Sequence, residues 1–215
     1  MLQETKSTVQ RPFNIGPIAD TSIKNPGDLI HSGIAGPEKA YNNKNYVINL
    51  VDEISGLVHV KFMKNKSEVP EMIREAITEM KNLFNLPAPE NATFQSDGES
   101  VYKGKKVSEV LAKLNLYQKF SPAYHPERNG SAEKNYRTIF NDARAILMSS
   151  PLPETYYPLA IEHAVMVRNL LPKGNRKISA YELLTKQDPI KILKRLHIFG
   201  TKYLMYMILK TTEQK

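Results

Sequence analysis

The sequence predicts a domain of the α/β or α+β class, in which helices cover a sheet. Short segments rich in Val and Ile come early in the chain and in quick succession, separated by Gly or Asn turns. After them, apolar residues recur at the spacing of amphipathic helices, and helical and strand-like segments alternate. Strands first and helices later indicate a sheet with helices on its faces.

The first three strands are expected at residues 28–32 ("DLIHS"), 45–53 ("NYVINLVDE") and 57–63 ("LVHVKFM"). They are rich in Val and Ile, and the turns between them favour an antiparallel meander. Glycine often marks irregular backbone in a strand, so Gly33 is consistent with a bulge where the first strand ends.

A long amphipathic helix is expected at residues 67–87, where apolar side chains recur at every third or fourth position. Ser67 is the expected N-cap of this helix, and Pro87 is expected to stop it. The later elements are a strand at 92–97, a helix at about 105–115, a strand at 116–120 and a mostly helical stretch from 131 to about 197.

Composition narrows the class of protein. The 215 residues include no Cys, which excludes disulfides and thiolate catalysis, and none of the five His has the spacing of a zinc site. No apolar run is long enough to span a membrane, and the polar start lacks the apolar core of a signal peptide, so we expect an intracellular protein without a membrane partner. The net charge of +8 fits either a polyanionic partner such as nucleic acid or an ordinary basic protein.

Two acidic residues stand where an α/β domain often places reactive groups. Asp97 ends the strand at 92–97, at a sheet edge where active-site loops gather, although an aspartate that opens a turn is the simpler interpretation. Glu133 lies near the start of a helix, away from its apolar stripe, and taken alone it is typical of a solvated charge. The two residues are separated by 35 others.

That spacing and the surrounding segments, "FQSDGESVY" and "FSPAYHPERNGSAEKNYRTI", resemble the second aspartate and the glutamate of retroviral and retrotransposon integrases. The closest resemblance is to the copia class of long-terminal-repeat retrotransposons, as found in yeasts, whose glutamate motif is similar to S-P-Y-x-P-x-x-N-G-x-A-E-R-x-N-R-T. The likeness covers roughly residues 28–200 and implies a ribonuclease-H-like α/β fold: a five-stranded mixed sheet flanked by helices, with extra C-terminal helices. The residues that match the glutamate motif are Ser121, Pro122, Tyr124, Pro126, Asn129, Gly130, Ala132, Glu133, Arg137 and Thr138.

The resemblance implies two-metal strand transfer of a DNA 3′-hydroxyl to a target phosphate, with magnesium or manganese as the cofactor and no zinc. Two such ions, about 4 Å apart, stabilise the attacking and the leaving oxygen of an in-line displacement. Magnesium prefers charged oxygen ligands, and the family holds its metal with three carboxylates. Asp97 and Glu133 correspond to two of these catalytic, metal-binding residues.

The third carboxylate is missing from this chain. The family's first aspartate lies in a motif similar to L-x-H-S/T-D-x-x-G-P, and "LIHSGIAGP" at 29–37 has Gly33 at the aspartate position. Asp28 lies an odd number of residues before Gly33, so on a strand its side chain points to the opposite face. Asp52 is the better candidate to replace the missing carboxylate. If a lost ligand costs about 4 kcal/mol of transition-state stabilisation, the rate falls about a thousandfold, so we expect weak or absent catalysis.

Basic residues near both acids are the expected DNA contacts. A single charge run is often only solvated, but two clusters that border one cleft favour DNA binding. Tyr102, Tyr117 and Tyr124 are suited either to stack on bases or to pack in the core. The predicted DNA-binding residues are Lys103, Lys105, Lys106, Arg128, Lys134, Arg137 and Arg144.

Three parts are expected: a polar lead-in at 1–27, an integrase-like core at 28–172 and a helical C-terminal extension at 173–215 with a divergent tail. The family's His/His/Cys/Cys zinc module is absent ahead of the core, which suggests a truncated, degenerate, pseudogene-like copy. Three hypotheses remain: an impaired integrase core, a non-catalytic nucleic-acid-binding module that associates with itself or with intact integrase, and a non-functional transposon remnant. A location in the nucleus and cytoplasm is carried over from the family.

Overall fold

The computed structural model describes residues 23–89, 92–121 and 130–201, with side chains in the last range from residue 136 onward. The strands are β1 (Leu29–Ala35), β2 (Tyr46–Asp52), β3 (Val58–Met63), β4 (Ala92–Ser96) and β5 (Leu116–Phe120). The helical elements are η1 (Lys66–Glu68), α1 (Val69–Phe84), α2 (Lys105–Lys113), α3 (Gly130–Met148), η3 (Glu154–Tyr156), α4 (Tyr157–Leu170), α5 (Ala180–Thr185) and α6 (Ile190–Leu193).

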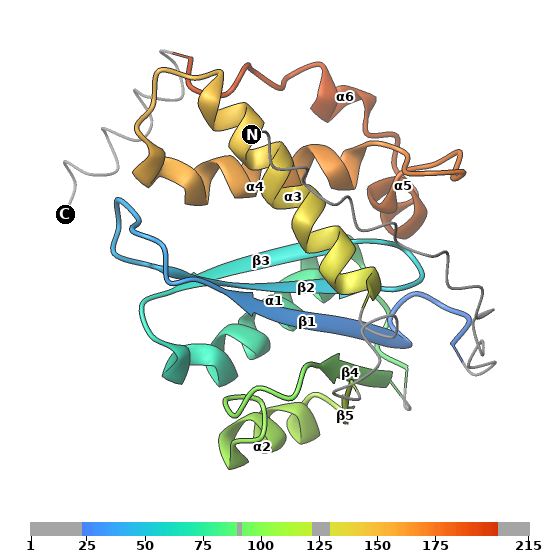
Figure 1. Ribbon diagram of the computed structural model, residues 1–215. Helices are drawn as coiled ribbons and strands as arrows, with labels where there is room; N and C mark the ends of the chain where they lie inside the picture. The colour runs from blue at the N-terminus through green and yellow to red at the C-terminus, as the bar shows by residue number, and fades with distance from the viewer. Residues whose placement is uncertain (1–22, 90–91, 122–129, 202–215) are drawn as a thin grey trace, which may run out of the picture.

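The strands form one mixed sheet in the order β3-β2-β1-β4-β5, which confirms the predicted five-stranded α/β architecture. β1, β2 and β3 are the predicted antiparallel meander; β4 pairs parallel with β1, and β5 pairs parallel with β4. Helices α1 and α2 lie on one side of the sheet, and α3 and α4 lie on the other (Figure 1). Within the described ranges, no helix is both long and apolar enough to cross a bilayer.

Strand β2 explains how this layered arrangement arises from the sequence. Ile48 and Leu50 point into the core beneath α1, while Val47 and Val51 point into the core beneath α3 and α4. A strand that is apolar on both faces is stable only in the interior of a sheet that is covered on both sides. The short helix α5 extends the α1 core, because Ala180 and Leu184 are buried in it.

The ends of α1 differ from those predicted. Ser67 is not the N-cap, because the helical chain already begins with η1, where the Asn65 N–H donates to Glu68 Oε1 at 2.8 Å. The helix also ends before Pro87, because Asn85 takes a left-handed conformation with a φ of 54°. A local side-chain hydrogen bond at one end and a left-handed residue at the other therefore set the ends of α1 more closely than the apolar periodicity does.

A buried amide fastens α4 to the outer strand β3. Asn169 Oδ1 accepts the Val58 N–H at 2.9 Å, and Asn169 Nδ2 donates to the Val58 carbonyl at 2.7 Å. Both polar groups of this asparagine are thus used by one residue of the strand.

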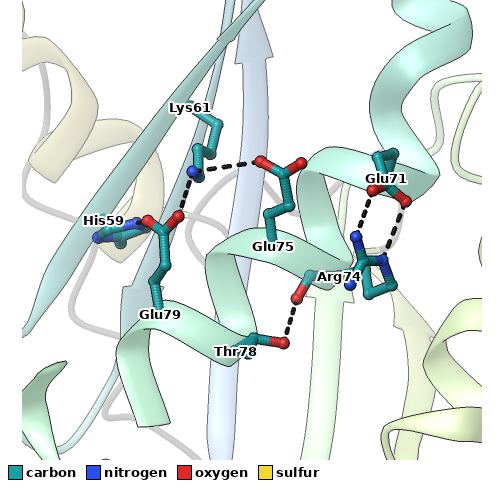
Figure 2. Close-up of polar contacts among 7 residues, drawn as sticks. All are labelled: His59, Lys61, Glu71, Arg74, Glu75, Thr78 and Glu79. Carbon is teal, nitrogen blue, oxygen red and sulfur yellow. Dashed lines mark hydrogen bonds and ion pairs between the residues drawn. The ribbon is translucent and has the colours of Figure 1, made fainter. Parts of the chain in front are cut away.

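A charged cluster joins the opposite face of β3 to α1 (Figure 2). His59 Nε2 lies 2.7 Å from Glu79 Oε2, while Lys61 contacts Glu79 and lies 3.2 Å from Glu75 Oε2. Burial lowers the pKa of His59, although the hydrogen bond to Glu79 acts in the other direction. This cluster holds α1 at the β3 side of the sheet, two strands away from β1.

Candidate functional site

Asp97 lies in the loop directly after β4, at the strand end where the sequence placed it. Its half-buried carboxylate accepts the Glu99 N–H through Oδ1 at 3.1 Å. Burial raises the pKa of Asp97, and the hydrogen bond from Glu99 opposes that rise. The Ser121 N–H donates to the Ser96 carbonyl at 2.8 Å, which continues the pairing of β4 with β5 up to this loop.

Gly33 and Asp97 each follow the last pair of the β1–β4 ladder. In that parallel ladder Ser32 pairs with Ser96, so Gly33 and Asp97 are the next residues on the two chains. Neighbouring strands lie about 4.8 Å apart, and paired residues point to the same face. A side chain at position 33 would therefore project next to the Asp97 carboxylate, as the motif resemblance implies for the first aspartate.

The interpretation of Gly33 as a bulge is wrong. Ser32, Gly33 and Ile34 pair in unbroken antiparallel register with successive residues of β2, and Gly33 does not have a positive φ. The backbone dihedral angles at this position therefore do not require a glycine. The consequence of the glycine is that position 33 has no side chain.

Asn49 of β2 faces Gly33 directly across the antiparallel ladder. Its side chain is 2% exposed and points to the α3 side of the sheet, as do Val47 and Val51. A Cβ built on Gly33 would lie 3.1 Å from Asn49 Oδ1. That oxygen is buried and has no hydrogen-bond partner among the described residues.

Glu133 belongs to the first turns of α3, but its side chain lies outside the described residues, as does that of Lys134. Arg128 lies in the range 122–129, also outside the described chain. The described part of α3 packs through Ile139 and Ala143 against the same face of the sheet to which Asn49 points. The helix that carries Glu133 is thus on the correct side of the sheet, and its carboxylate position stays a prediction.

Asp52 does not lie near the vacant position. It pairs with Ile30, and it is three residues from Asn49 along β2, so its side chain points to the opposite face about 10 Å further along the strand. Its carboxylate is fully buried and accepts the Gly27 N–H and the Ser55 N–H, each at 2.7 Å, and the Ser55 hydroxyl at 2.5 Å. Through its hydrogen bonds with Ser55, Asp52 stabilises the loop that joins β2 and β3.

The predicted basic residues are exposed where they are described. Lys103 approaches Gly98, the residue after Asp97, because its Nζ is 3.9 Å from the position that a Cβ on Gly98 would take. Lys105 and Lys106 begin α2, on the α1 side of the sheet. Arg137 and Arg144 lie on α3, across the other face, so the two clusters belong to helices on opposite sides of the sheet.

Tyr102 is a core residue, so of its two suggested roles the structure supports packing in the core. Its ring is fully buried against Phe94, and its hydroxyl shares a 2.8 Å hydrogen bond with Ser32 Oγ. Tyr117 is 63% exposed, and Tyr124 lies outside the described residues.

No protein-family model matches the chain. The chain is 28% identical over 192 residues to the Retrovirus-related Pol polyprotein from transposon RE1 of Arabidopsis thaliana, a match that covers 88% of this chain and 12% of that one. It is 26% identical over 179 residues to the Transposon Ty1-DR4 Gag-Pol polyprotein of Saccharomyces cerevisiae, covering 81% and 11% of the two chains. The chain is homologous to retrotransposon Pol polyproteins. It spans only about a tenth of the length of these relatives.

The fold of this retrotransposon-related chain is that of an integrase catalytic core, which is the predicted ribonuclease-H-like fold. The structure of the HTLV-2 integrase catalytic core domain in complex with magnesium, in a trimeric form, superposes with a TM-score of 0.56 and 19% sequence identity. The match covers 74% of this chain and 97% of that one. Homology and fold thus agree on an integrase core.

Two side chains, one on β2 and one after β4, carry oxygens of the kind that a hard divalent cation binds. Asp97 offers a half-exposed carboxylate, and Asn49 offers a buried amide oxygen without a partner; both are ligand types that magnesium and manganese accept. Among the described side chains, which exclude that of Glu133, no three His, Cys, Asp or Glu residues gather as a metal site. Gly33 contributes no ligand.

Sequence analysis missed Asn49 and Lys66. Asn49 interrupts the apolar run of β2, which is a detectable signal, but its position opposite Gly33 depends on the register of a hairpin. Lys66 Nζ lies 3.0 Å from Glu99 Oε2, and its charge acts to lower the pKa of Asp97. It comes from the crossover between β3 and α1, so its closeness to this loop depends on tertiary structure.

Proposed function

We propose that this chain is the core of a retrotransposon integrase that binds DNA beside Asp97 but catalyses strand transfer poorly, because position 33 has no carboxylate. The observation that carries the proposal is the register of β1 and β4, whose last pair, Ser32 and Ser96, is followed by Gly33 on one chain and by Asp97 on the other. The homology to Pol polyproteins and the integrase-core fold support the same assignment.

Asp97 and Glu133 are the residues proposed to hold magnesium or manganese. Divalent cations at such a site stabilise the charge that develops on the attacking and leaving oxygens of a phosphate. Asp97 is suited to this role because its carboxylate accepts the Glu99 N–H through Oδ1 and remains partly exposed. Loss of one anionic ligand at about 4 kcal/mol corresponds to a rate lowered about a thousandfold.

Strand transfer on a labelled duplex tests the catalytic part of the proposal. Wild-type chain, Gly33→Asp and the double variant Gly33→Asp/Asp97→Asn are compared in magnesium and in manganese. We expect little or no product from wild type, product from Gly33→Asp, and none from the double variant. Efficient transfer by the wild-type chain contradicts the proposed impairment, and activity of the double variant contradicts the role of Asp97.

A non-catalytic nucleic-acid-binding module is the second candidate function, and the exposed lysines at the Asp97 loop favour it. Lys103, Lys105 and Lys106 lie in and after this loop, and the chain carries a net charge of +8. Each phosphate that a lysine neutralises adds about one unit to the slope of log affinity against log salt. Association with itself or with intact integrase, and residence in the nucleus, belong to this proposal.

Equilibrium DNA binding at several salt concentrations, without divalent metal, tests this second candidate. We expect the triple variant Lys103→Ala/Lys105→Ala/Lys106→Ala to bind more weakly and to lower the salt slope by about 2 to 3. A matched triple variant, Lys177→Ala/Lys191→Ala/Lys194→Ala, removes the same charge from exposed positions around α5 and α6. Equal losses in both triple variants contradict a defined DNA surface, and aggregation without DNA binding favours a non-functional remnant.

A further inference from the structure

Asn49 is a buried polar residue within the apolar run of β2. The residues on either side of it, Ile48 and Leu50, are fully buried and apolar, and Asn49 itself is 2% exposed. Its Oδ1 is buried and has no hydrogen-bond partner among the described residues. Nearly all buried polar atoms in proteins are hydrogen-bonded, so a carbonyl oxygen that is kept without a partner is expected to have another role.

The position of this oxygen suggests what that role is. Asn49 Oδ1 lies 3.1 Å from the point where a Cβ on Gly33 would stand, so the amide group leans from β2 over β1. It enters the space that a side chain at position 33 would fill. From there it lies over the strand that neighbours β4, whose end carries Asp97.

We propose that Asn49 supplies, through Oδ1, an oxygen ligand of a divalent cation held with Asp97, in place of the missing carboxylate on β1. The inference rests on the proposed function, because it concerns the same site. An amide oxygen is a hard ligand that magnesium and manganese accept, but it carries no net charge. The chain therefore binds a divalent cation with fewer anionic ligands, and more weakly than a site with three carboxylates.

Two substitutions of Asn49 separate a ligand from a packing residue. Asn49→Leu keeps a similar volume and removes the oxygen, whereas Asn49→Asp keeps the oxygen and adds a charge. Replacing a buried polar atom that lacks a partner with an apolar group does not destabilise the metal-free protein. Asn49→Leu is therefore expected to melt, without metal, at a temperature no lower than that of wild type.

The experiment is a titration of manganese alone into the full chain, without DNA, followed by the electron paramagnetic resonance of free manganese. We expect wild type to bind manganese, Asn49→Leu to bind at least tenfold more weakly, and Asn49→Asp at least tenfold more tightly. Asn82→Leu is the matched control, because it makes the same substitution at an exposed position of α1 and is expected to keep wild-type affinity. Asp97→Asn is expected to weaken binding as much as Asn49→Leu.

Unchanged manganese affinity in Asn49→Leu overturns the proposal, as does the absence of binding in wild type. Unchanged affinity in Asp97→Asn overturns it as well, because the cation then binds elsewhere. If Asn49→Leu melts at a lower temperature than wild type, the manganese affinity of Asn49→Asp decides between the two roles. A ligand role predicts tighter binding in Asn49→Asp, and a packing role predicts no gain. DNA binding without metal is measured separately, so its failure counts against the proposed function and not against this ligand.

Discussion

Ser32 and Tyr102 share a buried hydrogen bond of 2.8 Å between their hydroxyls, which joins the middle of β1 to the segment that follows Asp97. The Tyr102 carbonyl also accepts Gln118 Nε2 at 2.6 Å, so this segment is fastened to β5 as well. The loop that carries Asp97 is thus held to the strands on both sides of β4.

Removal of the Tyr102 hydroxyl is expected to destabilise the fold. Tyr102→Phe leaves Ser32 Oγ buried without its partner, which costs about 1 to 3 kcal/mol of unfolding free energy in urea denaturation. Tyr117→Phe is the control at an exposed tyrosine and is expected to change stability by less than about 0.5 kcal/mol. In the double variant with Ser32→Ala, both polar partners are gone, so the loss should be smaller than the sum; a fully additive loss would contradict a direct bond.

Gly33→Asp is expected to fold and to become dependent on metal. The added Cβ meets only the end of the flexible Asn49 side chain, but the new carboxylate stands beside Asp97 and repels it. We expect a loss of about 1 to 2 kcal/mol in metal-free buffer, recovered when manganese is added in excess over its Kd. Gly33→Asn adds a side chain of the same shape without a charge, so manganese should restore less of its stability. Equal gains in stability with manganese in the two variants would contradict a cation shared with Asp97.

Asp52→Asn separates structural from metal-binding acids. The substitution replaces one of the two oxygens that accept hydrogen bonds from Gly27 and Ser55, so we expect unfolding to become easier by about 1 to 3 kcal/mol. Manganese affinity should equal that of wild type, measured by the same resonance titration. A large loss of manganese affinity would restore Asp52 as the substitute ligand.

Stability is expected to decrease as the pH falls through the titration range of His59. Burial lowers the pKa of His59 in the folded protein below its ordinary value of 6.5, so in this range the unfolded chain binds more protons. The stabilisation is therefore complete above about pH 6.5 and is lost as the pH falls toward the folded-state pKa. Urea denaturation between pH 7.5 and 5 measures this slope.

His59→Gln should flatten the slope, and the slope that remains is expected from His163, whose pKa burial also lowers. The hydrogen bond to Glu79 acts to raise the pKa of His59, so Glu79→Gln should lower that pKa further in an NMR titration of the ring. A pKa of His59 that rises in Glu79→Gln would contradict the contact drawn in Figure 2.

The periodicity of the sequence was sufficient to predict the strands and the main helices. The motif spacing was sufficient to predict that Asp97 lies at the end of a strand. The apolar run of β2 and the apolar stripe of α1 come from burial on regular backbone, and such patterns are visible in one dimension. The boundaries of α1 were less predictable, because Asn65 and Asn85 set them through local hydrogen bonding and a left-handed turn.

The site itself was only half predictable. That Gly33 lacks a carboxylate is visible in the sequence, but whether the backbone needs a glycine there depends on its φ angle and ladder register. Asn49 and Lys66 approach the site only after β2 pairs with β1 and the crossover packs beside the Asp97 loop. Likewise, Tyr102 could be assigned to the core only from its fully buried ring.

The amide of Asn169 has a consequence for how this molecule behaves at high concentration. β3 is the outermost strand on its side of the sheet, and the outward backbone groups of such a strand are a template for a strand of another chain. Because Asn169 occupies both backbone groups of Val58, an incoming strand cannot pair in register at the start of β3. One side chain thus protects this edge against aggregation, which neither a charge nor a proline within β3 does at that point.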